Sequence, residues 1–194
     1  MTAATGVREA PTDVGAAVEL GHEGALIEEA RSGRAAQYVW AVLRLLMGWT
    51  FFWAFIDKVF GLGFATATES SWLNGGSPTL GFLKFATHGP FTEFYQGIAG
   101  NAFVDVAFMT GLAGVGLSLL LGIGVRLGAA AGVLMLVLMY SAASMPPENN
   151  PFVHDRLIYA VVMVGLLASG SGQTFGLGRW WARTPVVRRF PILK

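Results

Sequence analysis

One short stretch holds a dense group of residues that could do chemistry. It reads PENNPFVHDRLIYA and places His154, Asp155 and Arg156 in consecutive positions ahead of an apolar run. Histidine can exchange a proton near neutral pH, and arginine can hold an oxyanion or a quinone carbonyl through directed hydrogen bonds. The stretch therefore predicts a ligand site. Asp155 has a second interpretation as a helix N-terminal cap, because a carboxylate in the first turn suits the helix dipole.

Two further ionisable residues lie near the ends of apolar runs. Lys58 lies near the end of the aromatic run from Val42 to Phe64, and Asp105 lies about one turn into another run. A carboxylate buried in apolar surroundings needs a cation. Neighbouring residues on a helix point about 100° apart, so Asp57 cannot easily pair with Lys58. We expect Lys58 to pair with Asp105 or with Asp155.

The composition is typical of an integral membrane protein. The 194 residues are 54% hydrophobic and 13% charged, and 26 of them are glycine. The absence of cysteine excludes disulfides and cysteine-ligated iron–sulfur or zinc sites. The three histidines lie outside the apolar runs, so neither haem nor another metal is predicted. No basic stripe with interleaved aromatic residues occurs outside the tail and the membrane edges, and no nucleic-acid partner is expected.

Four apolar runs position these residues and predict an all-α fold, an integral membrane four-helix bundle. The fourth run turns polar after Ala168, although Trp180 and Trp181 follow as the aromatic anchor typical of a membrane interface. The predicted spans are Tyr38 to Phe60, Ala102 to Ile123, Leu127 to Met145 and Leu157 to Gly178.

Small residues spaced by four predict close contacts between these helices. They are Gly114, Ser118 and Gly122, then Gly124, Gly128 and Gly132, and finally Gly165 with Ser169.

Arg44 lies about two turns inside the first span. Its side chain either reaches the cytoplasmic headgroups or holds a neighbouring helix. We favour the first interpretation, a cytoplasmic anchor.

Lysine and arginine are concentrated in the N-terminal segment, at Arg126 and in the C-terminal tail. Positive residues are retained in the cytoplasm, so both termini should be cytoplasmic and the connections 61–100 and 146–156 should lie outside. The predicted parts are an acidic, partly disordered cytoplasmic leader (1–36) with a short helix near Glu23 to Arg31, a four-helix membrane domain (37–181) and a basic cytoplasmic tail (182–194).

The long connection 61–100 should contain two short interfacial helices on the outer side. Ser77 with Pro78 begins the first, and Gly89 with Pro90 separates it from the second. Its aromatic residues form either an apolar lid over the bundle or an interfacial belt. They are Phe64, Trp72, Phe82, Phe85, Phe91, Phe94 and Tyr95, with Ile98 beside them.

Several blocks together resemble the DoxX/DoxD membrane family. They are GWTFFWAFIDKVFGLGFAT, WLNGGSPTLGFL, DVAFMTGLAGVGLSLLLGIGVRLGAAAG, NNPFVHDRLIYA and GLGRWW. The resemblance covers about Ala41 to Trp181 and omits the leader. It implies a four-helix protein of the bacterial inner membrane that is similar to the small DoxD-type subunit of thiosulfate:quinone oxidoreductase.

That resemblance implies oxidation of thiosulfate to tetrathionate, with electrons passed to a membrane quinone. A second, DoxA-like subunit or a soluble redox protein would then be a partner, and a homo-oligomer is possible. Other family members are similar to one that assembles a superoxide dismutase and a sulfurtransferase at the membrane. The alternative function is thus a non-catalytic scaffold for redox or sulfur-handling proteins.

For the quinone-linked function we expect Lys58 and Arg156 to neutralise an anionic substrate or reduced quinone, while His154 or Asp155 handles the proton. The predicted catalytic residues are Lys58, Asp105, His154, Asp155 and Arg156, and the predicted cofactor-binding residues are Trp53, Trp72, Tyr159 and His88.

Overall fold

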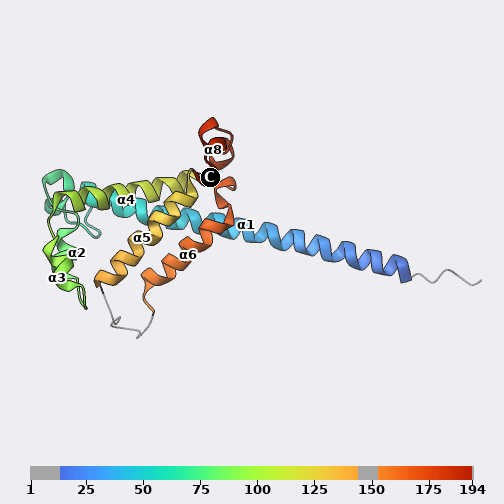
Figure 1. Ribbon diagram of the computed structural model, residues 1–194, viewed down its shortest axis with the longest axis horizontal. Helices are drawn as coiled ribbons and strands as arrows, with labels where there is room; N and C mark the ends of the chain where they lie inside the picture. Colours follow the sequence, from blue (N-terminus) through green and yellow to red (C-terminus); the bar gives the residue numbers. More distant parts are fainter. Residues whose placement is uncertain (1–13, 144–152, 194) are drawn as a thin grey trace, which may run out of the picture. The chain divides into compact units, whose positions relative to one another are not determined.

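A computed structural model describes residues 14–143 and 153–193 of the chain. These ranges contain helices and no strand, which confirms the all-α prediction (Figure 1). The α-helices are α1 (Val14–Phe60), α2 (Leu80–Phe85), α3 (Thr92–Gly97), α4 (Ala102–Leu121), α5 (Val125–Ala143), α6 (Asp155–Ser169), α7 (Gly178–Trp181) and α8 (Pro185–Arg189). Short 3₁₀ helices occur at Thr68–Ser70 (η1), Trp72–Asn74 (η2), Ser171–Gln173 (η3) and Pro191–Leu193 (η4).

The chain divides into two compact units, Met1–Ala36 and Gln37–Lys194. Helix α1 begins in the first unit and ends in the second, so the predicted short helix near Glu23 to Arg31 is part of a much longer one. Within the first unit, the side chains from 28 to 36 are exposed.

Among the described residues, three helices are long and apolar enough to cross a membrane. They are Glu28–Phe60 of α1, all of α4 and all of α5, and they make the chain a membrane protein by length and composition. The fourth predicted span is shorter than expected, because α6 has 15 residues and is only about 22 Å long against about 30 Å of hydrocarbon. Gly170 ends α6 in the left-handed conformation at φ 59°.

The core of the second unit takes residues from four helices. Helix α5 lies against both α4 and α6, and glycine contacts bring α1 against α4 and α6. The central side chains are Met47 and Phe51 of α1, Met109, Leu112, Val115 and Leu119 of α4, Val125, Ala129 and Leu136 of α5, and Ala160, Met163 and Leu166 of α6.

Glycines set how closely these helices approach. A Cβ atom at Gly116 would lie 2.7 Å from the backbone nitrogen of Phe52, and one at Gly48 would lie 2.9 Å from that of Leu120. Helices α1 and α4 therefore touch through their backbones. The small-residue pattern predicts close backbone approach at Gly128, Gly132 and Gly165, and there the nearest atoms belong instead to the side chains of Ser118, Met163 and Trp40. It is wrong at Gly114, where nothing lies within 4 Å.

Arg44 is not the headgroup anchor that we favoured. Its side chain is fully buried and donates hydrogen bonds to the carbonyls of Leu119 and Leu120, the latter at 3.3 Å. It also donates to the carbonyls of Thr174 and Phe175, at 3.2 and 3.0 Å. The last carbonyls of a helix lack helical partners, so Arg44 joins α1 to the end of α4 and to the segment after α6. The interhelical interpretation is the one that the structure supports.

Candidate functional site

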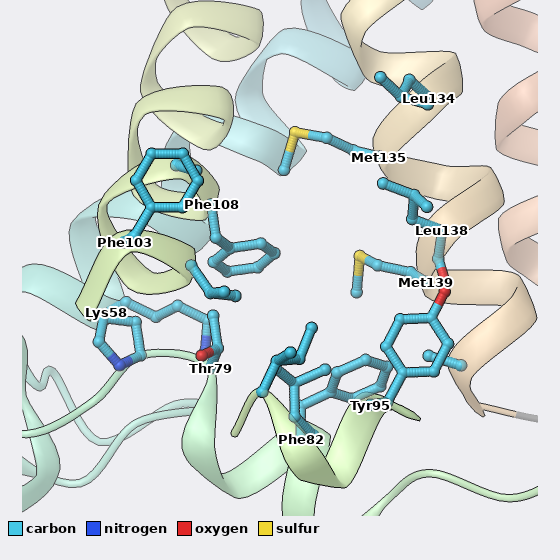
Figure 2. A pocket seen from close by; sticks show the side chains of 16 residues that line it. Lys58, Thr79, Phe82, Tyr95, Phe103, Phe108, Leu134, Met135, Leu138 and Met139 are labelled. Carbon is cyan, nitrogen blue, oxygen red and sulfur yellow. Dashed lines mark hydrogen bonds between the residues drawn. The ribbon is translucent and has the colours of Figure 1, made fainter. Parts of the chain in front are cut away.

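A cavity of about 480 Å³, here called the α4–α5 cavity, lies within the second unit. Helices α4 and α5 form its two sides, and the short helices α2 and α3 close one end (Figure 2). Its lining is apolar apart from a few groups, of which Lys58 is the charged one. Apolar pockets with few polar groups are typical of binding sites for small lipophilic molecules. The side chains that define it include Phe82, Tyr95, Phe108, Met135 and Leu138.

Asp105 holds the chain that leads into α2. Helix α4 begins at Asn101, whose side chain accepts from the amides of Phe103 and Val104, so Asp105 falls in the first turn. Its carboxylate is buried and accepts hydrogen bonds from the Ser77 hydroxyl at 2.9 Å, from the Thr79 hydroxyl at 2.6 Å and from the Thr79 amide at 3.1 Å. These contacts place Thr79 in the wall of the cavity.

The predicted Lys58–Asp105 ion pair is therefore wrong. Donors from Ser77 and Thr79 surround the carboxylate, and charge-assisted bonds of this kind satisfy a buried carboxylate without a cation. The prediction failed because the turn before α2 brings the hydroxyls of Ser77 and Thr79 to the Asp105 carboxylate. The sequence alone does not reveal these contacts, and it suggested Lys58 as the partner.

Asp57 and Lys58 point in different directions at the end of α1. The buried Asp57 carboxylate accepts from the amides of Ala65 and Phe64, at 3.0 and 3.4 Å, and holds the turn after the helix. Lys58 instead lines the α4–α5 cavity at the end where Thr79 lies (Figure 2). Within the described ranges its amine makes no hydrogen bond and no ion pair. An unpaired cation beside apolar walls favours a ligand that brings an oxygen acceptor or a negative charge.

Two residues, Tyr95 and His88, hold the long connection onto the end of α5. The Tyr95 hydroxyl lies 2.6 Å from that of Ser141 and donates to the Leu138 carbonyl at 3.3 Å. The amide of His88 donates to the carbonyl of Ala142 at 3.1 Å. The chain 86–95 is thus fixed to a helix end whose carbonyls need partners.

The aromatic residues of this connection divide between the two expected roles. Phe82, Tyr95 and Ile98 line the cavity, as a lid would. The other predicted members are exposed, as the interfacial-belt interpretation requires. They are Phe64, Trp72, Phe85, Phe91 and Phe94.

The start of α6 reaches the same end of the unit. His154, and not Asp155, is the N-terminal cap, because its Nδ1 accepts from the Arg156 amide at 3.2 Å. The Arg156 guanidinium lies 5.6 Å from the ring centre of Phe82, a residue of the cavity wall. Burial lowers the pKa of Arg156, while the Asp155 carboxylate raises it. The guanidinium nevertheless stays protonated near neutral pH, because the ordinary arginine pKa is very high.

His154 has limited freedom to act as a proton carrier in this arrangement. Its Nε2 lies 3.3 Å from Nη1 of Arg156, while Nδ1 already accepts from the backbone. A neutral imidazole has one acceptor nitrogen, so only one of these contacts can be a hydrogen bond at a time. The residues that precede 153 in the PENNPFVHDR stretch lie outside the described residues.

The predicted site residues are therefore brought together only in part. Lys58 lines the cavity, Asp105 lies behind Thr79, and Arg156 touches the wall at Phe82. The four predicted cofactor-binding residues lie outside the lining. Trp53 contacts Trp49 and Phe64 at 5.6 and 5.2 Å between ring centres, while Trp72, Tyr159 and His88 are exposed.

Sequence reasoning missed most of the cavity wall, which comes from α4 and α5. Met135, Leu138, Met139 and Ala142 recur at helical spacing on α5, and that spacing is the one available signal. Apolar residues are equally common on lipid-facing helix surfaces, so the pattern does not single out a cavity. In the described ranges no three histidine or carboxylate side chains lie close enough to hold a metal ion.

Comparisons of the chain with models of known protein families, with curated proteins and with solved structures found no match.

Proposed function

We propose that the protein is the membrane subunit of a quinone-linked oxidoreductase and that the α4–α5 cavity binds the quinone. The observation that carries the proposal is the Lys58 amine, which makes no hydrogen bond or ion pair in the described part of the chain, at the edge of a cavity with apolar walls. A quinone has a flat apolar ring, an apolar chain and carbonyl oxygens, and its reduced form can carry negative charge. The apolar wall would hold the ring while Lys58 binds an oxygen.

The position of the cavity suits a ligand that arrives from the bilayer. Phe103 and Leu134 line it and yet are 80% and 60% exposed, so the cavity opens beside two helices that are apolar enough to cross a membrane. In such helices the exposed apolar surface meets lipid tails. A lipophilic ligand can therefore enter sideways without passing through water.

By analogy with the DoxD-type subunit that the motifs resemble, the electron donor would be thiosulfate. Two thiosulfate ions join through a new sulfur–sulfur bond to form tetrathionate and release two electrons, and the quinone takes up these electrons with two protons to form quinol. The chain has no cysteine for an iron–sulfur cluster, so a second subunit would bring the electrons to the cavity. Arg156, beside the cavity wall at Phe82, would help to attract the anionic donor.

The membrane arrangement belongs to the same proposal. Helix α6 with the segment through Trp181 would form the fourth crossing of a four-helix bundle, which keeps both termini in the cytoplasm of a bacterial cell. The contact of Arg156 with Phe82 supports this, because it brings the start of α6 to the end of the unit where α2 lies. Helices α2 and α3 would then lie at the outer face.

Binding can be tested with decylubiquinone and the full chain in detergent, by isothermal titration calorimetry. Leu138→Trp fills the cavity, and we expect it to weaken binding at least tenfold. Leu117→Trp is the matched control, since Leu117 is 42% exposed on α4 and does not line the cavity. Lys58→Met should weaken binding about tenfold, the value of one charge-assisted hydrogen bond. If Leu138→Trp binds decylubiquinone as tightly as wild type does, the α4–α5 cavity is not the quinone site.

Activity needs the partner as well as the quinone. Membranes that contain the protein, with its co-purifying partners, should reduce decylubiquinone when thiosulfate is added, and membranes with Leu138→Trp should do so much more slowly. Quinone binding without thiosulfate-dependent reduction would keep the quinone site and reject thiosulfate as the electron donor.

A second candidate function is a scaffold that anchors soluble redox or sulfur-handling proteins. The exposed helical segment from 28 to 36 favours it, because it carries Glu28, Glu29, Arg31 and Arg34. Cross-linking in intact cells distinguishes the two functions. Deletion of residues 1–35 should abolish cross-links of a scaffold to its partners and leave quinone binding intact.

A further inference from the structure

A second cavity, here called the Arg126 cleft, lies at the opposite end of α5 from the α4–α5 cavity. It has a volume of about 70 Å³ and is formed by the first turn of α5, the end of α6 and the segment from Gly170 to Ala182. Glycine backbones make up much of its wall, and Arg126, Gln173 and Trp181 bring its polar side chains. A hole of this size suits a small headgroup and has no room for a substrate with a chain.

The charge around the cleft is positive. Arg126 is exposed and, within the part of the chain that the structure describes, makes no hydrogen bond or ion pair. No acidic residue lines the cleft, and the sequence has none after Asp155. The first turn of the 19-residue helix α5 adds backbone amides and the positive end of a helix dipole. The cleft therefore favours an anion, and phosphate matches both guanidinium and amide donors.

The cleft also lies at a membrane surface. Arg126 is the second residue of a helix that is long and apolar enough to cross a membrane, so it falls at the edge of the hydrocarbon. In the chain that follows the cleft residue Gly178, Trp180, Phe190 and Ile192 are 62%, 54% and 65% exposed. An exposed tryptophan such as Trp180 is typical of the membrane–water interface, and Phe190 and Ile192 add apolar surface beside it.

The tail that follows the cleft is fixed to the rest of the unit, and its arginines therefore have defined positions. The Trp181 indole donates to the Leu193 carbonyl at 2.6 Å, and Val187 is fully buried. Arg183, Arg188 and Arg189 are exposed along this fixed segment.

From these observations we infer that the Arg126 cleft binds the phosphate of an anionic phospholipid. Arg126 and the first amides of α5 hold the phosphate, Gln173 donates a further hydrogen bond, and the exposed aromatic residues of the tail enter the acyl boundary. Basic pockets between membrane helices are a recognised way to bind such headgroups. This inference does not depend on the proposed quinone function.

The experiment uses the full chain in nanodiscs made of equal amounts of phosphatidylglycerol and phosphatidylcholine, with retained lipids counted by native mass spectrometry. Wild-type protein should retain phosphatidylglycerol in preference to phosphatidylcholine. Arg126→Gln should lower that preference about fivefold, the effect of one cation near an anionic surface. Arg126→Lys should keep most of it, because the charge remains.

The matched control is Arg31→Gln, which removes an exposed arginine from the leader and should leave the preference unchanged. Gln173→Leu provides an independent variant if Arg126→Gln does not fold, and it should weaken retention without a change in net charge. Equal retention of the two lipids by wild type, or an unchanged preference in both cleft variants, overturns the inference. A final measurement compares inorganic phosphate with phosphatidylglycerol as the stabilising ligand. If inorganic phosphate stabilises the protein through Arg126 while phosphatidylglycerol does not, the cleft binds a soluble anion and the lipid assignment is wrong.

Discussion

At the scale of single residues, Arg44 shows how a membrane helix can bury a guanidinium without a carboxylate. Four carbonyls from two separate segments surround it, two at the end of α4 and two in the segment after α6. Arginine suits this position because its fork of donors can serve carbonyls on both sides at once. The residue therefore joins helices, and we assign it no direct part in chemistry.

Replacing Arg44 should destabilise the protein strongly. We expect Arg44→Gln to lower stability by about 2–4 kcal/mol, because several buried carbonyls lose their donors. Arg44→Lys should help little, since a single ammonium cannot reach both α4 and residues 174–175. Thermal unfolding in detergent measures the effect. Arg34→Gln is the control, because Arg34 is exposed and bonds only to Ala30 of its own helix. Equal melting temperatures for the two glutamine variants would contradict the prediction.

Asp105 and Lys58 should act independently of each other. Asp105→Asn should cost about 1–2 kcal/mol, because the Ser77 and Thr79 hydroxyls lose a charged acceptor. Lys58→Met should cost little or should stabilise, because it removes an unpaired cation from an apolar wall. A double-mutant cycle on thermal stability should therefore give a coupling below about 0.5 kcal/mol. A coupling energy three times larger would contradict this prediction and would support a Lys58–Asp105 ion pair.

At the scale of elements, the contact between α1 and α4 depends on the absence of side chains. Gly48 and Gly116 let the two backbones approach, and Arg44 fixes the same pair of helices at the end of α4. Without a hydrophobic driving force in lipid, such close packing is a main source of helix association. The side of α4 that carries Gly116 therefore determines how this part of the bundle assembles.

Gly116→Ala should separate these helices. Its new methyl would lie 2.7 Å from the Phe52 nitrogen, which is backbone and cannot move aside, so we expect a loss of about 1–3 kcal/mol. Gly114→Ala lies on the same helix with nothing within 4 Å and should be neutral or slightly stabilising, because alanine favours helix. The two melting temperatures test the prediction directly. A Gly114→Ala protein as unstable as Gly116→Ala would show that the contact with Phe52 does not set the cost.

At the scale of the whole molecule, the number of membrane crossings determines whether the two termini lie on the same side. Three helices are long enough, while α6 is shorter and continues through a glycine-rich segment. If α6 and this segment do cross, the two termini lie on the same side. If they do not, the termini lie on opposite sides.

Single cysteines can decide this, because the chain has none of its own. We expect Phe85→Cys and Asp155→Cys to react with an impermeant maleimide in intact cells, while Arg31→Cys and Ile192→Cys react only after lysis. These four positions are exposed. Labelling of Ile192→Cys from outside, with Arg31→Cys protected, would establish three crossings and rule out the four-helix bundle.

The sequence by itself determined the features that depend on neighbouring residues. The lengths of the apolar runs predicted α4 and α5 to within about two residues, and the Ser77-Pro78 and Gly89-Pro90 pairs placed α2 and α3. Helix length, capping and proline geometry act locally, so a sequence pattern is enough for them. Charge and composition likewise indicated a membrane protein.

Only the tertiary structure decided which polar group meets which. Arg44 and Asp105 found carbonyl and hydroxyl partners far away in sequence, and those partners are common residues that no pattern marks. Gly116, which lies outside the predicted small-residue spacing, is in contact with Phe52, while the predicted Gly114 has nothing within 4 Å. The physical reason is that lipid-facing and protein-facing positions of a membrane helix are equally apolar, so hydrophobic periodicity does not identify the buried face. The α4–α5 cavity, with Lys58 unpaired at its end, became visible only when the helices were in place.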